Sequence, residues 1–277
     1  MGSWLAQARQ RFHGECLAGP ISRTRGVPSI ADVSNKASRE IAIALIDKIG
    51  ASHEMAEKPA GQTAGHMFES VCQRFLRDSL DKLAHLRPAV FQVERGKAIS
   101  LFDQYAHLDE LRQLADASRQ LKTHLGTDYL IKPDIVVFRN PESDAAINRH
   151  EVLVDETVGR RTALRTVNNA AATLHASISC KLTIRSDRVQ NTRSEALKLS
   201  RNRKGQLPHI AAVTAEPVPS RIAAIALGTG DIDCVYHFAL DELVAVLRDQ
   251  GRDSLELVET MIEGQRLRDI ADLPLDL

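Results

Sequence analysis

The 277-residue chain is poor in aromatic residues, in cysteine and in long apolar runs. Aromatic residues make up 4% of it, which argues against a single-strand binder, because such proteins stack bases on aromatic side chains. No apolar run approaches the ~20 residues of a membrane span, and the N-terminus lacks the apolar core of a secretory signal. The four cysteines include no C-x-x-C pair, so neither a zinc ribbon nor a disulfide scaffold is indicated. We therefore expect a cytoplasmic protein with reduced thiols.

Several common catalytic motifs are also missing. The ten histidines include no H-x-x-x-H pair on a predicted helix, which argues against zinc hydrolase chemistry. No G-x-S-x-G elbow is present, so an α/β-hydrolase serine is not indicated. The stretch 228–230 (GTG) lacks the rest of a dinucleotide-binding fingerprint and is expected to form a turn.

Charge is balanced over the whole chain but not along it. Formal net charge is zero, with 36 basic and 36 acidic residues, which alone argues against a nucleic-acid binder. Segment 181–204 is different, because it holds eight basic residues and only two acidic ones, Asp187 and Glu195, for a net charge of +6. The basic residues are Lys181, Arg185, Arg188, Arg193, Lys198, Arg201, Arg203 and Lys204. Such a run can be a solvated helix face. Here it follows a strand with polar residues on one face, which favours a DNA-binding segment.

Alternating helix and strand patterns predict an α/β fold with a central mixed sheet flanked by helices, in one domain over 1–277 with a catalytic core at about 125–240. We expect residues 1–30 to be irregular, and Ser34 or Asn35 to cap a helix that ends near Ile49 and Gly50. The other expected helices are 66–85, 108–122, 189–200, 220–227 and 239–250, after a loop at 51–65. The expected strands are 131–138, 151–156, 175–184, 209–215 and 234–238.

Two of the expected strands carry polar residues at positions that suit catalysis. Asp134 opens one strand after a proline, and Ser179 and Lys181 share one face of another, because they are two residues apart. A carboxylate beside a strand-borne lysine is the core of a PD-(D/E)-x-K nuclease site. Phosphodiester hydrolysis needs a hard cation held by oxygen ligands, an activated water, and positive charge against the phosphate. Asp134 and Lys181 therefore become candidate catalytic residues, although Pro-Asp is also a common way to start a strand.

The second acid of this motif is missing from its usual position, so it must come from elsewhere in the chain. Ser179 stands where an acid is usual, two residues before Lys181. Glu195 lies roughly two turns into the next expected helix, about 9 Å along it, so it can return to the metal with Asp134. Glu69, on the expected helix after the glycine-containing loop, is a further candidate acid. Either glutamate could instead be an ordinary helix-surface residue.

The turn after the lysine strand carries Arg185, Asp187 and Arg188. Arginine pairs with guanine O6 and N7, and aspartate accepts a hydrogen bond from cytosine N4, so the three could read adjacent G·C pairs in the major groove. The alternative is that Asp187 caps the next helix and the arginines bind phosphates.

Collinear motifs resemble the NgoMIV family of type II restriction endonucleases, in the PD-(D/E)xK superfamily. The resemblance runs from about residue 10 to the C-terminus. It rests on SISCK-x-TIRSDR-x-QN-x-RSE, RNRKG-x-LPHI, VTAEP-x-PSRI, IALGTG, IDCVYHFAL and LPLDL, with GQT at 61–63, FE at 68–69, YAHL at 105–108, PDI at 133–135, INR at 147–149 and LVDE at 153–156.

The resemblance implies a bacterial restriction–modification enzyme. It would be a Mg²⁺-dependent hydrolase, with two ions expected per active site, and a homotetramer that binds two DNA sites. It would cut double-stranded DNA at GCCGGC after the first G, leaving 5′ four-base overhangs and 5′-phosphates, alongside a cognate methyltransferase.

The resemblance also assigns residue roles. It places catalysis on Asp134, Ser179, Lys181, Glu195 and Glu69, with the metal on Asp134 and Glu195. It places readout of the inner CCGG on Arg185, Asp187 and Arg188, and readout of the outer G·C pair on Gln62, through the minor groove, with Ser34 and Arg221. Segments around Ser34 and at 156–174 diverge from the family pattern.

Two other functions fit the same residues. A repair or junction-resolving nuclease would recognise DNA shape, and Arg185, Asp187 and Arg188 would then have no base to read. A non-catalytic DNA-binding protein on the same fold is disfavoured, because Asp134, Lys181 and Glu195 are all present. A palindromic site fits a two-fold dimer in which each subunit reads one half-site.

Overall fold

A six-stranded mixed sheet lies at the centre of the computed structural model, which describes residues 2–50, 61–87, 89–120, 123, 131–228 and 230–277, and only the backbone of residues 186–188. Its strands, in spatial order, are β3 (Phe91–Arg95), β4 (Ile135–Arg139), β5 (Thr173–Lys181), β6 (His209–Thr214), β7 (Cys234–His237) and β8 (Leu267–Asp269). The pairs β3–β4 and β4–β5 are antiparallel, and β5 to β8 run parallel. A separate two-stranded ribbon joins β1 (Arg23–Thr24) and β2 (Val27–Pro28). The predicted α/β class with a mixed sheet is confirmed.

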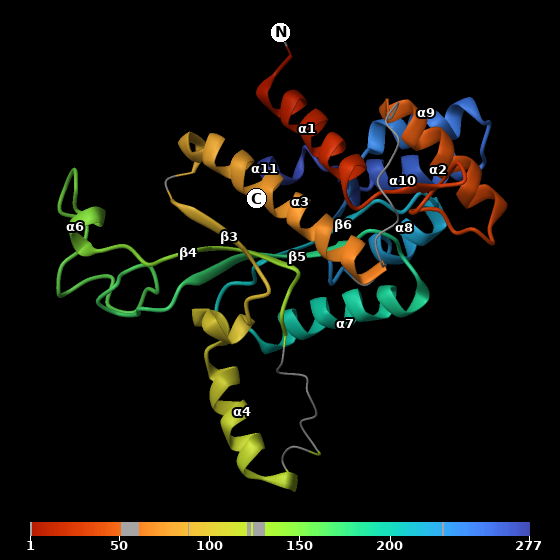
Figure 1. Ribbon diagram of the computed structural model, residues 1–277. Helices are drawn as coiled ribbons and strands as arrows, with labels where there is room; N and C mark the ends of the chain where they lie inside the picture. Colours follow the sequence, from red (N-terminus) through yellow and green to blue (C-terminus); the bar gives the residue numbers. More distant parts are fainter. Residues whose placement is uncertain (1, 51–60, 88, 121–122, 124–130, 229) are drawn as a thin grey trace.

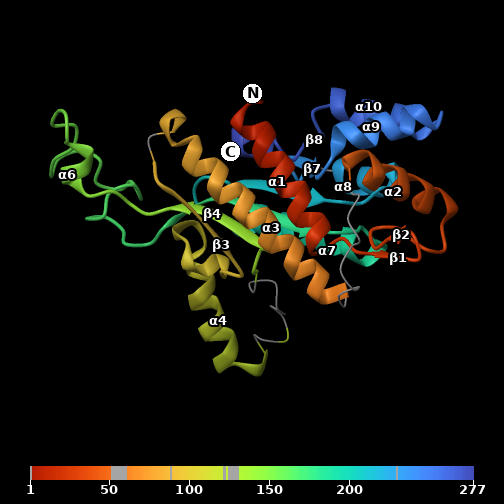
Figure 2. The ribbon, with the colours of Figure 1, turned by 45° about the horizontal axis from the view of Figure 1, so that its top comes forward.

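Helices cover both faces of this sheet. The α-helices are α1 (Trp4–Ala18), α2 (Lys36–Ile49), α3 (Gly61–Lys82), α4 (His107–Ala117), α6 (Asp144–Ile147), α7 (Ser186–Asn202), α8 (Pro219–Ala226), α9 (Leu240–Asp249), α10 (Ser254–Glu263) and α11 (Leu273–Asp276). Short 3-10 helices are η1 (Ala84–Leu86), η2 (Ile99–Leu101) and η3 (Asp103–Tyr105). Helices α3 and α7 lie on opposite sides of the sheet, and α1 packs beside α3 (Figures 1 and 2).

The alternation of β5 separates the core from the polar side of the sheet. Ile178 and Cys180 are buried, and Cys180 faces Cys72 of α3. On α3, buried apolar residues recur at helical spacing (Phe68, Cys72, Phe75, Leu76 and Leu80), and Phe68 and Leu76 are fully covered. Burying side chains of this size contributes ~1.5–3 kcal/mol each. This packing holds β5 in place, so that the other face of the strand presents Ser179 and Lys181 toward the side covered by α7.

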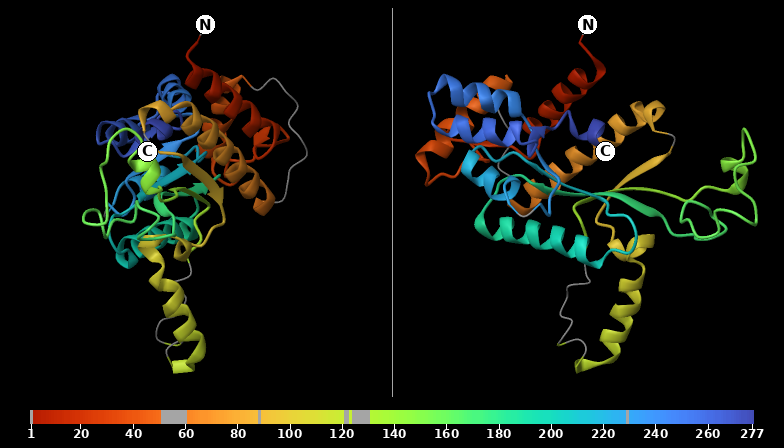
Figure 3. Two further views of the ribbon diagram at one scale, coloured as in Figure 1. Left: turned by 90° about the vertical axis from the view of Figure 1, so that its left-hand side faces the viewer. Right: turned by 180° about the vertical axis from the view of Figure 1, so that it is seen from behind.

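Two parts of the chain extend away from the sheet. Helix α4 projects from one side of the molecule, and the segment around α6 projects from the end of the sheet (Figures 1 and 3). Both carry exposed apolar side chains, including Leu114 on α4 and Val152 beyond α6.

The predicted cap of α2 is confirmed, and it is Asn35 rather than Ser34. The Asn35 side chain accepts a hydrogen bond from the Ser38 N–H, at 3.0 Å. Gly50 ends the helix with φ of +91°, a left-handed conformation that favours glycine. The irregular structure predicted for 1–30 is wrong for Trp4–Ala18, which form helix α1. There Ser3 accepts a hydrogen bond from Ala6 N, and Phe12 is buried at helical spacing with its neighbours.

Two strand predictions are wrong, and side chains explain both. Residues 151–156 form no strand. The side-chain amide of Asn148 binds the backbone groups of Leu153 and Val154 that would otherwise form hydrogen bonds with a neighbouring strand. Strand β5 ends at Lys181 instead of continuing to 184, because the N–H of Ile184 donates to the Glu216 carboxylate.

Other expected elements are confirmed with shifted ends. The loop expected at 51–65 ends earlier, because α3 begins at Gly61, while 51–60 lie outside the described residues. Strand β4 starts at Ile135 rather than Ile131, after Pro133, which has no N–H to donate. Helix α4 ends at Ala117, and Ser118 interrupts the helix expected at 108–122; Arg119 and Gln120 are helical again, while 121–122 lie outside the described residues. Across the described part of the chain, no helix is long and apolar enough to span a membrane.

Candidate active site

Asp134 and Lys181 meet where β4 begins and β5 ends, because these neighbouring strands are antiparallel. Lys181 Nζ lies 2.7 Å from Asp134 Oδ2. The same oxygen accepts a hydrogen bond from the backbone N–H of Cys180 at 2.7 Å and a longer one from Ser179 Oγ at 3.4 Å. Three donors from one strand end thus fix one carboxylate oxygen. The juxtaposition of Asp134, Ser179 and Lys181 expected from strand alternation is present.

The lysine is held in its charged form. Burial acts to lower the pKa of Lys181, but the Asp134 carboxylate and, more weakly, Glu195 outweigh burial and raise the pKa above its ordinary value. Lys181 therefore presents a fixed positive charge at this end of the sheet.

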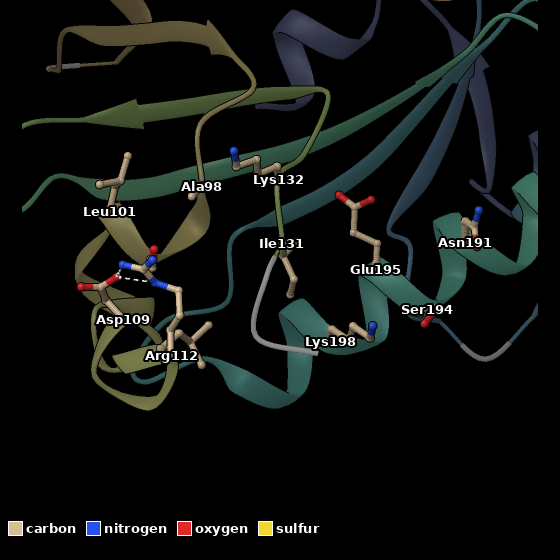
Figure 4. A pocket seen from close by; sticks show the side chains of 12 residues that line it. Ala98, Leu101, Asp109, Arg112, Ile131, Lys132, Asn191, Ser194, Glu195 and Lys198 are labelled. Atoms are coloured by element: carbon tan, nitrogen blue, oxygen red, sulfur yellow. Dashed lines mark hydrogen bonds and ion pairs between the residues drawn. The ribbon is translucent and has the colours of Figure 1, made fainter. Parts of the chain in front are cut away.

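Glu195 reaches the same site from α7. Burial, and then the nearby Asp134 carboxylate, raise the pKa of Glu195 from 4.5 to about 7, while Lys181 and Lys198 act to lower it. Figure 4 shows its carboxylate rising from α7 toward the sheet, with Lys132 and Lys198 around the same cavity. Within the described residues, no group donates a hydrogen bond to this carboxylate. The helix thus returns an acid to Asp134 and Lys181, as its spacing predicts.

The donor set fits a hard divalent cation. Every hydrogen bond to Asp134 from the described residues falls on Oδ2, so Oδ1 stays available, and so do both oxygens of Glu195. Magnesium is commonly held by one or two carboxylates and keeps several waters. Where side chains are described, no group of three or more His, Cys, Asp or Glu gathers as a closed metal cage. Glu195 lines a cavity, which leaves room for water and substrate oxygens beside the two carboxylates.

Three adjoining hollows form a groove past these residues, and we call them together the site groove. The first, of about 740 Å³, contains Glu195, and the second, of about 480 Å³, contains Lys181; Asn191 lines both. The third, of about 540 Å³, shares Arg185 with the second and reaches Arg221. The catalytic candidates Lys181 and Glu195 therefore line the same groove as the base-reading candidates Arg185 and Arg221.

Glu69 lies on α3, across the second hollow from Lys181. Its Oε2 accepts from Arg95 of β3 at 3.0 Å and faces His66 Nδ1 at 3.2 Å. The structure thus places Glu69 on the wall of the site groove, where Arg95 orients it. Gln62, on the first turn of α3, lines the same hollow.

The base-reading candidates are only partly described. Arg185 is exposed and occupies the N-cap of α7, so Asp187 is the second helical residue and not the cap. This backbone position argues against the capping alternative. The side chains of Asp187 and Arg188 lie outside those that the structure describes.

Ser34 and Arg221 are brought together through Asp32, a residue that sequence reasoning missed. Asp32 Oδ1 accepts from Ser34 Oγ at 2.6 Å and from Ser34 N at 3.1 Å, and Asp32 Oδ2 lies 2.5 Å from Arg221 Nη2. The Ser34 hydroxyl and the Arg221 guanidinium hold the pKa of Asp32 at about 2. The available signal was the Asp-x-Ser spacing, since aspartate often binds its own backbone two residues on.

Comparison with known proteins identifies several similar chains. A family model described as NgoMIV restriction enzyme matches residues 12–277. The type II restriction enzyme NgoMIV of Neisseria gonorrhoeae is 50% identical over 285 aligned positions, which cover 100% of this chain and 99% of that one. Among solved structures, the Bse634I restriction endonuclease with cognate DNA is 14% identical, with a TM-score of 0.37, and covers 84% of this chain and 90% of its own. The PspGI–substrate DNA complex is 12% identical, with a TM-score of 0.32, and covers 98% and 89%. Structural likenesses this distant support no inference.

Proposed function

Because the chain belongs to the NgoMIV restriction enzyme family and is a type II restriction endonuclease, we propose that it cuts duplex DNA at the palindrome GCCGGC. Cleavage falls after the first G of each strand and leaves 5′-phosphates on four-base 5′ overhangs. The observation that carries the chemistry is the 2.7 Å contact between Asp134 Oδ2 and Lys181 Nζ, beside the raised-pKa carboxylate of Glu195.

Asp134 and Glu195 are the residues that would hold Mg²⁺. When bound, Mg²⁺ supplies positive charge to the phosphate and lowers the pKa of a coordinated water. The fit rests on the free Oδ1 of Asp134 and on the Glu195 carboxylate, which has no hydrogen-bond donor among the described residues.

The chain's own groups supply the rest of the catalytic environment. Lys181 keeps its proton and places positive charge where negative charge develops on the phosphate. The Cys180 N–H and Ser179 hold Asp134 in one orientation, so the carboxylate needs no reorganisation when substrate arrives. Glu69, oriented by Arg95, provides a further acid on the wall of the site groove.

We assign recognition of the DNA sequence to the same groove. Arg185, Asp187 and Arg188 read the inner CCGG, because arginine recognises guanine and aspartate recognises cytosine in the major groove. Supporting this, Arg185 stands exposed at the start of α7, in the segment with net charge +6. For the outer G·C pair we assign Gln62, through the minor groove, together with Ser34 and Arg221, which Asp32 already links.

The enzyme acts as a homotetramer, a dimer of dimers that engages two DNA sites, with one domain per chain over 1–277 and a catalytic core at about 125–240. It works in the bacterial cytoplasm beside a methyltransferase that protects the same sequence. These assignments follow from the family resemblance and from the two-fold symmetry of a palindromic site.

Plasmid digestion tests the proposal. One plasmid carries several GCCGGC sites, and a matched control carries the same sites with the outer pair exchanged, as ACCGGT. With Mg²⁺, the wild-type enzyme should convert the first plasmid into discrete fragments and leave the second intact. A smear, cleavage of branched DNA only, or no cleavage would refute the proposal.

A further inference from the structure

Glu216 is a fully buried carboxylate that the catalytic scheme does not use. It follows β6 in the VTAEP stretch at 213–217. Its backbone is fixed on both sides, because its N–H donates to Thr214 Oγ1 at 3.1 Å and its carbonyl oxygen lies 3.2 Å from His237 Nε2. A carboxylate in the core needs partners, since a buried charge without them is costly.

Its two oxygens point to two different elements. Oε2 accepts a hydrogen bond from the N–H of Ile184 at 2.8 Å. Oε1 accepts from the N–H of Val218 at 3.2 Å and lies 3.7 Å from Arg221 Nη1. One side chain therefore connects the turn after β5 with the first turn of α8.

Both elements present arginines to the site groove. Ile184 immediately precedes Arg185, the N-cap residue of α7, and Val218 is the N-cap residue of α8, which carries Arg221. Arg185 and Arg221 line the same hollow of about 540 Å³. Glu216 thus holds the backbone that leads into Arg185 and lies beside the guanidinium of Arg221, which Asp32 also binds.

An ionised carboxylate at this buried position costs electrostatic free energy. Burial raises the pKa of Glu216 to about 7, while the Ile184 N–H, Arg221 and the Val218 N–H act to lower it. A glutamine of the same shape avoids the buried charge but offers only one acceptor oxygen. Its NH₂ group would face either the Ile184 N–H or the N–H groups of Val218 and Arg221, so it cannot satisfy both sides.

We propose that Glu216 is a positioning residue that fixes Arg185 and Arg221 relative to each other, and so couples readout of the inner CCGG to readout of the outer G·C pair. This inference rests on the proposed base-reading roles of the two arginines. It follows that a change at Glu216 loosens discrimination at both kinds of base pair, whereas a change at one reader loosens only its own.

Glu216→Gln tests the coupling on three duplexes. They are GCCGGC, ACCGGT with the outer pair exchanged, and GCTAGC with an inner pair exchanged. For each we measure kcat/KM with Mg²⁺ and equilibrium binding without metal. Glu216→Gln should reduce the preference for GCCGGC about tenfold or more against both altered duplexes, in keeping with the worth of one base-reading contact. Arg221→Ala should reduce the preference for GCCGGC over ACCGGT but not the preference over GCTAGC.

Asp269→Asn is the matched control, because Asp269 is also a buried carboxylate that accepts backbone hydrogen bonds and pairs with an arginine, Arg9. It should lower the urea midpoint but keep the preference for GCCGGC. If Glu216→Gln fails to fold, as judged by circular dichroism, Glu216→Asp takes its place. Asp keeps the charge but is one methylene too short to reach both partners, so the same double loss is expected.

An unchanged preference in the folded Glu216 variant, or a loss against only one altered duplex, overturns the coupling. If wild-type protein cuts GCCGGC and the Glu216 variant keeps the wild-type preference for that site, the Glu216 inference alone is refuted. Wild-type protein that neither cuts nor prefers GCCGGC refutes the proposed function, and with it the inference.

Discussion

Replacing Glu195 by glutamine should stabilise the metal-free protein while it abolishes cleavage. The carboxylate is partly buried beside Asp134, and its pKa rises from 4.5 to about 7. Each step of one in pKa corresponds to ~1.4 kcal/mol, so ionised Glu195 costs the folded state up to ~3 kcal/mol. Glu195 lines an open cavity, and solvent there lowers the expected gain to about 1–3 kcal/mol.

The sign of the pH dependence is fixed by the direction of this change. A carboxyl group whose pKa is raised on folding destabilises the protein as pH rises from 4.5 through about 7, because the unfolded chain ionises it more easily. The advantage of Glu195→Gln over wild type should therefore be complete at pH 8 and nearly absent at pH 4.5.

Urea unfolding in EDTA, followed by circular dichroism at both pH values, measures the difference. Glu263→Gln, an exposed change on α10, is the control and should leave stability unchanged at either pH. Added Mg²⁺ should stabilise wild type but not Glu195→Gln, and cleavage by the variant should fall at least ~100-fold. The reasoning is refuted if Glu195→Gln is the less stable protein at pH 8, or if its advantage is the same at pH 4.5.

The remaining predictions concern three other residues. Lys181→Ala should slow single-turnover cleavage at least ~100-fold and leave specific binding in place, as gel-shift titration would reveal; lost binding would assign Lys181 a mainly structural role. Asp187→Ala should lower discrimination within CCGG about tenfold, measured as a ratio of cleavage rates, and a lower melting temperature without that loss would favour a structural role. Asn35→Ala should reduce the free energy of unfolding by ~1 kcal/mol in a urea titration, because it removes the cap of α2, and an unchanged value would show that water replaces the cap.

Local patterns predicted the elements whose signals lie within one segment. The α2 helix was predictable because Asn35 and Gly50 mark its two ends. Asp134, Ser179 and Lys181 were predictable as neighbours, because strand alternation decides which side chains share a face. Glu195 was predictable from its place on the helix after Lys181, although α7 begins at Ser186 rather than at the expected 189, so that Glu195 lies about two and a half turns into the helix.

What sequence reasoning missed depends on contacts between distant segments. The end of β5 is set by Glu216, which is 32 residues beyond Ile184 in the chain. Strand β3 has only a short alternating pattern, from Phe91 to Glu94, and is defined by pairing with β4. The link from Ser34 to Arg221 passes through Asp32, which lies 189 residues before Arg221 in the chain. Helix α1 is a different case, because the spacing of its buried Phe12 and Cys16 was present in the sequence.

Single-turnover cleavage of one GCCGGC duplex by wild type, Asp134→Asn and Asp233→Asn tests the central claim most directly. Asp233 binds the N–H of Ile210 at the opposite end of the parallel strands from Lys181, and its side chain is half exposed. We predict that wild type and Asp233→Asn cut after the first G of both strands only when Mg²⁺ is present, and that Asp134→Asn does not cut. Equal cleavage by Asp134→Asn, or cleavage by wild type at other positions, would contradict the account.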